Sequence, residues 1–429
     1  MGEKEKNMFG CFTEEEELLR GEDAPDSEVS VIKVVTEVLG NVKSGTDVSN
    51  IPLPASVLDP VSSLEKSKKS MQRGELLPRI PKMETAEERF LGVIRWILSG
   101  LPKEKFGKKP YNPILGETFR CCFKHKDPEN GVTYLVCEQV SHHPPITATH
   151  LNNPSVGWEV NSVSKPEPRF YGNYVEIKLN GISRLYLHDL DEEYHLTRPT
   201  VFQSGLLGIG TKRVELMGLS YVVCEKSNLV AIIDFKGKSF FGMTGVQHSV
   251  SGSIRKLDSD EVIYEVEGVW DGVVKTTNVK TGERTTLYSK EESAEDAMHV
   301  WLPPESDLEE TNSLAVWKKC SDAIWKKDSK LANEEKKAVE DAQRAHRKER
   351  EENKTEWKPQ YFDNLGGDAY FLKEEILKQI PKARSREESQ LHESSPIRNL
   401  QNPSGKEPKS GEGLQSVTKR VTKLLKVSK

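Results

Sequence analysis

The chain has 429 residues, of which 30% are charged and 35% hydrophobic, and its formal net charge is −5. This length suits one large domain with tails or two ordinary domains, and the small net charge argues against general nucleic-acid binding. The six cysteines show no CxxC spacing, no apolar run is long enough to cross a bilayer, and no signal peptide is evident, so we expect a reduced cytosolic protein.

The chain opens with an acidic segment, residues 1–27, in which positions 14–17 are all glutamate. We expect this segment to be a disordered leader, with Phe9 and Phe12 as isolated apolar residues. A helix is predicted next, because Ser27 suits an N-cap and valines recur at helical spacing as far as Val42. Its many β-branched residues weaken helix propensity, so it needs a partner surface.

Residues 51–54, Ile-Pro-Leu-Pro, are predicted to be extended, because each proline disfavours a helix at the residue before it. Residues 60–103 are predicted to be helical. Thr85 and Glu88 have the spacing of a capping box, and the apolar stripe that follows ends at Gly100. We assign this stripe to core packing.

A proline-rich stretch, Lys108–Glu117, reads KKPYNPILGE. Two prolines so close together predict a rigid, irregular loop. The ammonium group of Lys109 and the amide of Asn112 suit an anionic phosphate and a polar head group. On its own, the same pattern also fits a solvated lysine beside a structural turn.

A second motif, Glu138–Pro145, reads EQVSHHPP. His142 and His143 end a predicted strand, because a proline cannot continue the pairing ladder after them. Imidazoles near neutral pH donate hydrogen bonds to anions, bind metals or move protons. Taken alone, a histidine pair is also explained as a structural corner.

From Glu117 to about Ser289, short strand patterns alternate with turn residues such as Asn180-Gly181 and Asp271-Gly272. Many strands at this spacing, with few helices between them, predict an antiparallel sheet that closes into a barrel. A barrel of sufficient size leaves an interior that holds one ligand.

Residues 305–356 are predicted to be helical and are highly charged, with Trp317 and Trp325 indicating a packed helix. Lys336, Glu340 and Arg344 are spaced four apart and therefore share one helix face. In isolation, this pattern is also that of a salt-bridged solvated face.

Residues 380–429 have the composition of a disordered tail. Its last residues, 414–429, place apolar side chains on one helical face and basic ones around the rest. Such a segment suits the surface of an anionic membrane, although a frayed basic tail explains it equally well. The basic residues in question are Lys419, Arg420, Lys423 and Lys426.

The two motifs at 108–117 and 138–145 resemble the K-P-x-N-P-x-L-G-E and E-Q-V-S-H-H-P-P signatures of the oxysterol-binding-protein-related family of lipid-transfer proteins. The resemblance spans residues 28–375 and implies one lipid-binding domain of α+β, mainly β, class. The implied fold is a large antiparallel near-closed β-barrel around a lipid tunnel. It comprises a lid at 28–58, N-terminal helices at 60–103, the barrel at 115–290 and C-terminal helices at 305–375.

The resemblance also implies a site. Its phosphoinositide head group would be held by Lys109, Asn112, His142, His143, Lys336, Glu340 and Arg344. Ile51 and Leu53 in the lid segment would contact the second lipid, and the basic residues of the tail would touch the membrane. Without the resemblance, the predicted lid helix is equally well explained as an ordinary amphipathic core helix.

The implied function is intracellular exchange of phosphatidylserine and phosphatidylinositol 4-phosphate between membranes. No enzyme is expected, because P-loop, GxSxG and HExxH motifs are missing from the sequence. We expect a monomer with a phospholipid or sterol ligand and no cofactor, metal or nucleic acid. It would be cytosolic, in peripheral contact with anionic membranes at endoplasmic reticulum contact sites.

Two alternatives remain. The first is a sterol/phosphatidylinositol 4-phosphate exchanger of the same fold, and the second is a lipid sensor or scaffold that transfers little. The phosphatidylserine branch implies a serine hydroxyl near the head group where this chain has Pro168.

Overall fold

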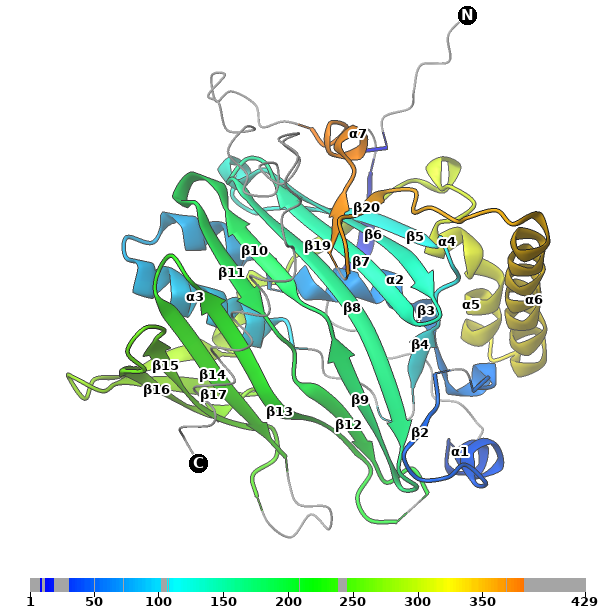
Figure 1. Ribbon diagram of the computed structural model, residues 1–429, viewed down its shortest axis with the longest axis horizontal. Coiled ribbons are helices and arrows are strands. Elements are labelled where there is room, and N and C mark those ends of the chain that lie inside the picture. The colour runs from blue at the N-terminus through cyan, green and yellow to red at the C-terminus, as the bar shows by residue number, and fades with distance from the viewer. Residues whose placement is uncertain are drawn as a thin grey trace, which may run out of the picture.

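The computed structural model describes residues 8–9, 12–18, 31–49, 51–71, 73–101, 106, 108–207, 209–237, 245–367 and 369–381. A strongly curved antiparallel sheet of 17 strands dominates it (Figure 1). Helices α2 and α3 lie behind the sheet in this view, α5 and α6 lie at its right, and α1 lies at the lower right. The helices are α1 (Val31–Leu39), α2 (Ser63–Lys66), α3 (Ala86–Ser99), α4 (Ser313–Val316), α5 (Lys318–Trp325), α6 (Ser329–Asn353) and α7 (Glu374–Leu377).

Neighbouring strands in the sheet are mostly neighbours in sequence. From β5 to β8 the chain forms successive hairpins, and β13 to β18 do the same. These strands are β5 (Thr118–Lys124), β6 (Val132–His142), β7 (Pro145–Asn153), β8 (Trp158–Phe170), β13 (Arg213–Cys224), β14 (Leu229–Lys236), β15 (Ser249–Lys256), β16 (Val262–Val269), β17 (Val273–Asn278) and β18 (Arg284–Ser289).

The sheet divides between β8 and β13. The first half of β8 pairs with β10 and its second half with β9, while β13 pairs with β11 and with β12. Figure 1 shows β10 and β11 beside the upper part of β8, and β9 and β12 beside its lower part. The four inserted strands are β9 (Tyr174–Asn180), β10 (Ser183–Leu187), β11 (Glu192–Leu196) and β12 (Thr200–Ser204).

The remaining strands extend the edges or stand apart. β19 joins β5, and β1 joins β19, whereas β2 pairs with the end of β8. The pair β3–β4 is parallel, and β20–β21 is a separate hairpin. Their bounds are β1 (Thr13–Leu18), β2 (Thr46–Asp47), β3 (Leu58–Ser62), β4 (Lys109–Tyr111), β19 (His299–Leu302), β20 (Phe362–Asn364) and β21 (Tyr370–Leu372).

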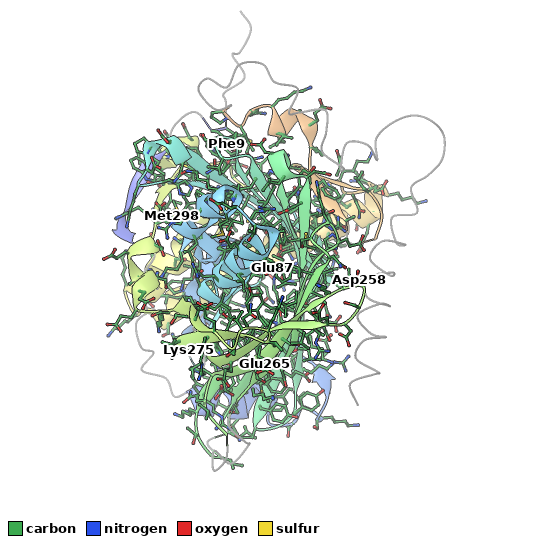
Figure 2. The ribbon with its side chains drawn as sticks, turned by 90° about the vertical axis from the view of Figure 1, so that its left-hand side faces the viewer. Phe9, Glu87, Asp258, Glu265, Lys275 and Met298 are labelled. Carbon is green, nitrogen blue, oxygen red and sulfur yellow. The ribbon has the colours of Figure 1, made fainter. Side chains whose placement is uncertain are left out.

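One end of the sheet's concave side is filled by the α2–α3 region. The predicted capping box is present, since Thr85 accepts from the amide of Glu88 and Glu88 accepts from that of Thr85. Phe90 of α3 is fully buried and joins one apolar cluster with Phe119 of β5 and Trp158 of β8. At the outer end of α3, Glu87 accepts a hydrogen bond from Tyr264 of β16. Figure 2 shows Glu87 beside the strands that carry Glu265 and Lys275.

The predicted class, α+β with a dominant antiparallel sheet and helices before and after it, is confirmed. Among the described strands, residue-by-residue register places β18 beside β17, and β19 between β1 and β5. None of the described helices is long and apolar enough to cross a membrane.

Three segments differ from expectation. Thr13–Leu18, within the expected disordered leader, forms β1 on β19, and Phe9 packs against Tyr134 because buried apolar contacts outweigh the acidic composition. Within the expected helices at 60–103, Ser67–Met71 and Gly74–Lys82 are 3₁₀, and in the second of these Pro78 and Pro81 remove backbone donors. Residues 362–372, expected to be helical, form the β20–β21 hairpin.

Glu117, fully buried at the start of β5, joins four segments. Its Oε1 accepts from Ser62 and, at 2.7 Å, from Ser313, while its Oε2 accepts from Trp317 Nε1 at 2.9 Å and from the Ile114 amide at 3.0 Å. Burial raises the pKa of this carboxyl, and the four donors oppose that rise. The carboxyl therefore holds together parts of the chain that are distant in sequence.

We expect Glu117→Leu to lower the free energy of unfolding by about 3–5 kcal/mol, because it leaves four buried donors without an acceptor. Urea denaturation followed by circular dichroism measures this change. The exposed Glu349→Leu on α6 is the control and should shift the midpoint little. Equal midpoints for the two variants would contradict the role assigned to Glu117.

Candidate functional site

The site begins at β4 and the loop after it. β4 pairs in parallel with β3, and Tyr111 stacks on Trp317 with ring centroids 4.3 Å apart. Lys109 Nζ donates to Asn112 Oδ1 at 2.7 Å, and Asn112 Nδ2 donates to the Ser49 carbonyl at 3.5 Å. The loop thus presents an ammonium and an amide beside the segment that follows α1.

The loop is fixed on its other side by β6 and α6. The Gly116 amide donates to the Gln139 carbonyl at 3.0 Å, and the Leu115 amide donates to Gln343 Oε1 of α6 at 2.9 Å. Gly116 has a φ of +79°, which residues with a side chain rarely adopt, so a larger residue is strained there although an added Cβ would be in ordinary contact with the Trp357 ring at 3.5 Å. The loop, the β6 end and α6 therefore form one assembly.

The histidine pair occupies the turn between β6 and β7. The two rings lie edge to face with centroids 4.5 Å apart, and His143 is exposed whereas His142 is half-buried. His142 Nδ1 lies 3.0 Å from the Pro113 carbonyl. A carbonyl only accepts, so Nδ1 carries the proton and the neutral ring leaves Nε2 as a lone-pair acceptor.

The charge state of His142 follows from its surroundings. Burial lowers its pKa, and the neighbouring His143 and Arg347 lower it further, while the Pro113 carbonyl and Glu340 oppose them. The ring is therefore biased toward its neutral form. Nε2 becomes a donor when an incoming anion favours protonation.

Helix α6 brings Glu340 and Lys336 to the same place. Lys336 Nζ donates to Glu340 Oε1 in a partly buried i,i+4 ion pair. Burial lowers the pKa of Lys109 to about 8; the nearby Lys336 adds to this shift and Glu340 opposes it. Glu340 thus affects the pKa of both Lys109 and His142, and the Leu115–Gln343 and His142–Pro113 hydrogen bonds join the three segments.

Arg344 is placed differently from the other predicted residues. It is exposed and forms an ion pair with Asp341 at 2.6 Å, one turn along α6 from Glu340. The charged groups of α6 that shift the pKa of Lys109 or His142 are Lys336, Glu340 and Arg347, and Arg344 is not among them. Arg344 thus stands at the outer rim.

The predicted lid residues lie in two apolar clusters. Ile51 packs with Leu39 of α1 and Phe170 at the end of β8. Leu53 packs with Leu58, Tyr111 and Trp317 beneath the loop of the site. A hydrogen bond of 2.9 Å from the Ala55 amide to Asn333 Oδ1 ties this segment to α6.

Three contributors to the site were not among its predicted residues. The Pro113 carbonyl, Gln343 and Arg347 act through contacts that exist only after the three segments meet. Of these, only Arg347 lay within a basic run on the predicted helix. The basic residues Lys419, Arg420, Lys423 and Lys426 lie outside the described residues.

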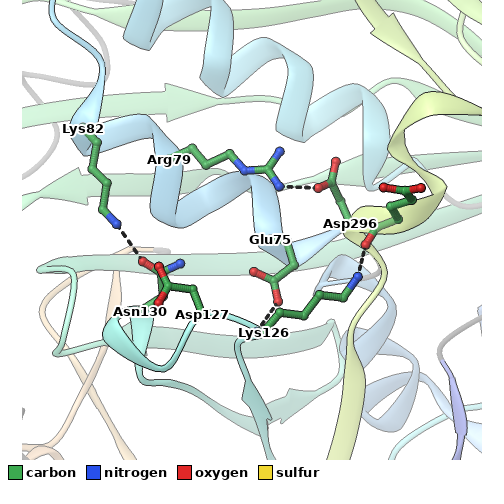
Figure 3. Close-up of a pocket in the computed structure, with 8 residues that line it drawn as sticks. Glu75, Arg79, Lys82, Lys126, Asp127, Asn130 and Asp296 are labelled. Carbon is green, nitrogen blue, oxygen red and sulfur yellow. Dashed lines mark hydrogen bonds and ion pairs between the residues drawn. The ribbon is translucent and has the colours of Figure 1, made fainter.

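A separate cavity of about 370 Å³ lies between the α2–α3 region and the turn before β6 (Figure 3). Its charged groups satisfy one another, with Arg79 paired to Asp296 at 2.6 Å and Lys82 bonded to Asn130 at 2.9 Å. The Lys126 amide donates to Glu75 at 2.8 Å. This polar cavity shares no residue with the site described above.

The site's groups suit an anion. Lys109, Lys336 and the two imidazoles supply donors, and Asn112 supplies an amide. Among the described residues, no group of three or more His, Cys, Asp or Glu side chains is arranged to hold a metal ion. The arrangement brings cationic and neutral hydrogen-bond donors together around one carboxylate, that of Glu340.

The chain resembles known proteins over most of its length. The family model described as oxysterol-binding protein matches residues 37–380. An oxysterol-binding protein homolog of Schizosaccharomyces pombe is 36% identical over 364 residues, which cover 82% of this chain and 75% of that protein. Human oxysterol-binding protein-related protein 5 is 36% identical over 345 residues, covering 78% of this chain but 39% of that protein.

Solved structures share the fold. The Osh1 ORD domain in complex with cholesterol aligns with a TM-score of 0.68 and 23% identity, covering 86% of this chain and 91% of that chain. The Osh3 ORD of Saccharomyces cerevisiae in complex with PI(4)P aligns with a TM-score of 0.63 and 21% identity, covering 84% and 94%.

We expect Lys336→Met to raise the pKa of Lys109, because it removes a like charge, and Glu340→Gln to lower it below about 8. Lys109 is mostly protonated below that pH, so anion binding should weaken as the pH rises through it. The pH dependence of amine labelling at Lys109, quantified by peptide mass spectrometry, measures these shifts. The exposed Lys275 is the internal control, and identical titration of the two lysines would refute the assignment.

Proposed function

Because the chain belongs to the oxysterol-binding protein family, we propose that it extracts phosphatidylserine and phosphatidylinositol 4-phosphate and exchanges them between membranes inside the cell. The observation that carries the proposal is the meeting of the 109–116 loop, the histidine turn and α6 around Glu340. In this proposal the corner formed by these segments holds a phosphate, and the acyl chains lie on the concave side of the curved sheet.

In this proposal the phosphate lies between the loop and the histidine turn. Lys109 and Lys336 neutralise its charge, His142 and His143 donate to its oxygens, and Asn112 binds a polar group of the head. Glu340 accepts from head-group hydroxyls and keeps the two ammonium groups in place. Arg344, at the rim, contacts phosphate only if it leaves Asp341.

Phosphate binding should be accompanied by proton uptake. His142 needs a proton on Nε2 to donate, and Lys109 has a pKa near 8, so a bound phosphate favours the charged form of both. By linkage, affinity for the phosphoinositide should rise as the pH falls toward neutrality. The expected pH dependence of affinity arises from His142 and Lys109.

Exchange requires no chemistry at the lipid. Two lipids that compete for one interior exclude one another, so a gradient of one drives transport of the other through differential occupancy. The Osh3 ORD structure was solved with PI(4)P, which supports the same ligand for a chain of the same fold. We therefore propose a carrier and not an enzyme, active in the cytosol and on membrane surfaces at endoplasmic reticulum contact sites.

The sterol alternative rests on a specific observation. The Osh1 ORD structures contain cholesterol or ergosterol, and this chain has Pro168, which offers no hydroxyl, where the segment after α1 crosses β8. The Val48 amide donates to the Pro168 carbonyl at 3.1 Å. Competition of phosphatidylserine or ergosterol liposomes against bound phosphatidylinositol 4-phosphate decides between the two, because only the true second ligand displaces it.

A lipid sensor or scaffold that transfers little is the second alternative. It would bind the same lipids and show the same competition. Transfer of labelled lipid between two liposome populations distinguishes it, since a carrier moves many lipid molecules per protein.

We expect the double variant His142→Ala, His143→Ala to extract phosphatidylinositol 4-phosphate at least about tenfold less well, because two charge-assisted hydrogen bonds are lost. A fluorescent phosphoinositide sensor on donor liposomes reports extraction. His195→Ala on β11, whose imidazole lies 3.3 Å from Glu193, is the matched control and should extract normally. Undiminished extraction by the double variant would remove the histidines from the site.

We further propose that Lys419, Arg420, Lys423 and Lys426 attach the chain to anionic membranes. Replacing all four with glutamine should lower recovery with phosphatidylserine-rich liposomes, since each basic residue contributes about 1 kcal/mol. Flotation at low and high salt measures this recovery. Equal flotation of the variant and the original chain would contradict the proposal.

A further inference from the structure

Arg198 lies where the sheet divides. It follows β11 and precedes β12, at the point where β13 changes its partner from one of these strands to the other. Opposite, β8 changes its partner from β10 to β9 just after Ser162. Arg198 therefore lies between two strand pairings and belongs to neither.

Arg198 faces the interior of the sheet. Alternate residues of a strand share one face. Val160 of β8, Leu185 of β10 and Leu196 of β11 belong to the buried apolar cluster on the concave side. Ser162, Ser183 and Arg198 are each two residues from one of these three, and their mutual contacts place them on the same side.

The partners of Arg198 are neutral. Nη2 donates to Ser162 Oγ at 2.5 Å and to Ser183 Oγ at 3.2 Å, and the two hydroxyls are 2.7 Å apart. Within the described ranges no carboxylate forms an ion pair with Arg198, and burial alone lowers its pKa. A guanidinium group stays charged under such conditions, so the interior of the sheet holds a cation without a counter-charge.

The Arg198 side chain is partly accessible. The side chain is surrounded by protein closely enough to be desolvated, yet it is intermediate in exposure. Lys109 combines the same two properties at the site described above. The N–H groups of Arg198 that do not bind the serines are therefore available to a ligand that reaches the accessible part of the side chain.

We propose that Arg198, supported by Ser162 and Ser183, is an internal binding site for the carboxylate of a single-chain amphiphile, which enters the sheet with its acid group first. A carboxylate matches the planar fork of a guanidinium and supplies the missing counter-charge, which a hydroxyl does not. The aliphatic chain would then lie on the face of the sheet to which Val160, Leu185 and Leu196, themselves buried, belong. An uncompensated buried cation is costly, and such a ligand removes that cost.

The proposal rests on the proposed function only in requiring an interior that admits a lipid chain. The test uses the full chain and the fluorescence of cis-parinaric acid, its methyl ester and its alcohol at neutral pH. We expect the acid to bind at least about tenfold more tightly than the ester or the alcohol, as a charge-assisted hydrogen-bond pair provides. Arg198→Met should remove this preference, and Arg198→Lys should retain part of it.

Arg184→Met is the matched control. Arg184 neighbours Ser183 on β10 but faces the other side of the sheet, where its guanidinium lies 5.6 Å from the Phe371 ring centroid. This variant should keep the preference for the acid. Extraction of phosphatidylinositol 4-phosphate by Arg198→Met shows whether that variant is folded, and the double histidine variant should lose extraction while still binding the acid.

Equal binding of acid, ester and alcohol by the original chain overturns the proposal, whatever the folding of the variants. Tight binding of the alcohol, equal to that of the acid, also overturns it and identifies a hydroxyl site. A preference for the acid that survives Arg198→Met places the carboxylate elsewhere and overturns it as well. If the original chain prefers the acid but extracts no phosphoinositide, the proposed function fails and this inference stands.

Discussion

The buried carboxyl of Glu117 is the interaction on which the site depends. It accepts hydrogen bonds from Ser62 before α2, from Ile114 in the loop, and from Ser313 and Trp317 in the α4–α5 region. These segments are up to 200 residues away from it in sequence. A buried carboxyl with four donors is tolerated only when each donor is in place, so this one residue enforces the mutual position of its partners.

A second buried carboxyl, on the neighbouring strand, also joins segments that are distant in sequence. Glu138 of β6 accepts from the amides of Gln360 at 2.6 Å and Tyr361 at 2.7 Å, which anchors the chain that follows α6. Glu117 holds the 109–116 loop on one side of the histidine turn, and Glu138 holds the segment that follows α6 on the other. The cations of the site are thereby positioned before any ligand arrives, which lowers the entropy cost of binding.

The sequence allowed the motifs of the site to be predicted but not their connections. The loop, the histidine pair and the face of α6 each have a local pattern, because proline spacing and helical periodicity are local properties. The hydrogen bonds of Glu117 and the contact between Gln343 and Leu115 depend on tertiary structure. The sequence alone does not distinguish a buried glutamate from a solvated one. For the same reason, the prediction of disorder from composition was wrong at Thr13–Leu18, where pairing with β19 determines the conformation.

Electrostatics connects the site to the interior of the sheet. Lys109 at the loop and Arg198 at the division of the sheet are both desolvated cations with incomplete compensation, the first beside an ion pair and the second beside two hydroxyls. Each is costly without an anion, so each favours a ligand that supplies one. If the two proposed sites share one interior, a phospholipid would bind with its phosphate at Lys109, and a single-chain acid would bind with its carboxylate at Arg198. The two ligand classes would then compete for the same space but bind different cations. Removing the Lys109 ammonium should favour the single-chain acid, and removing the Arg198 guanidinium should favour the phospholipid.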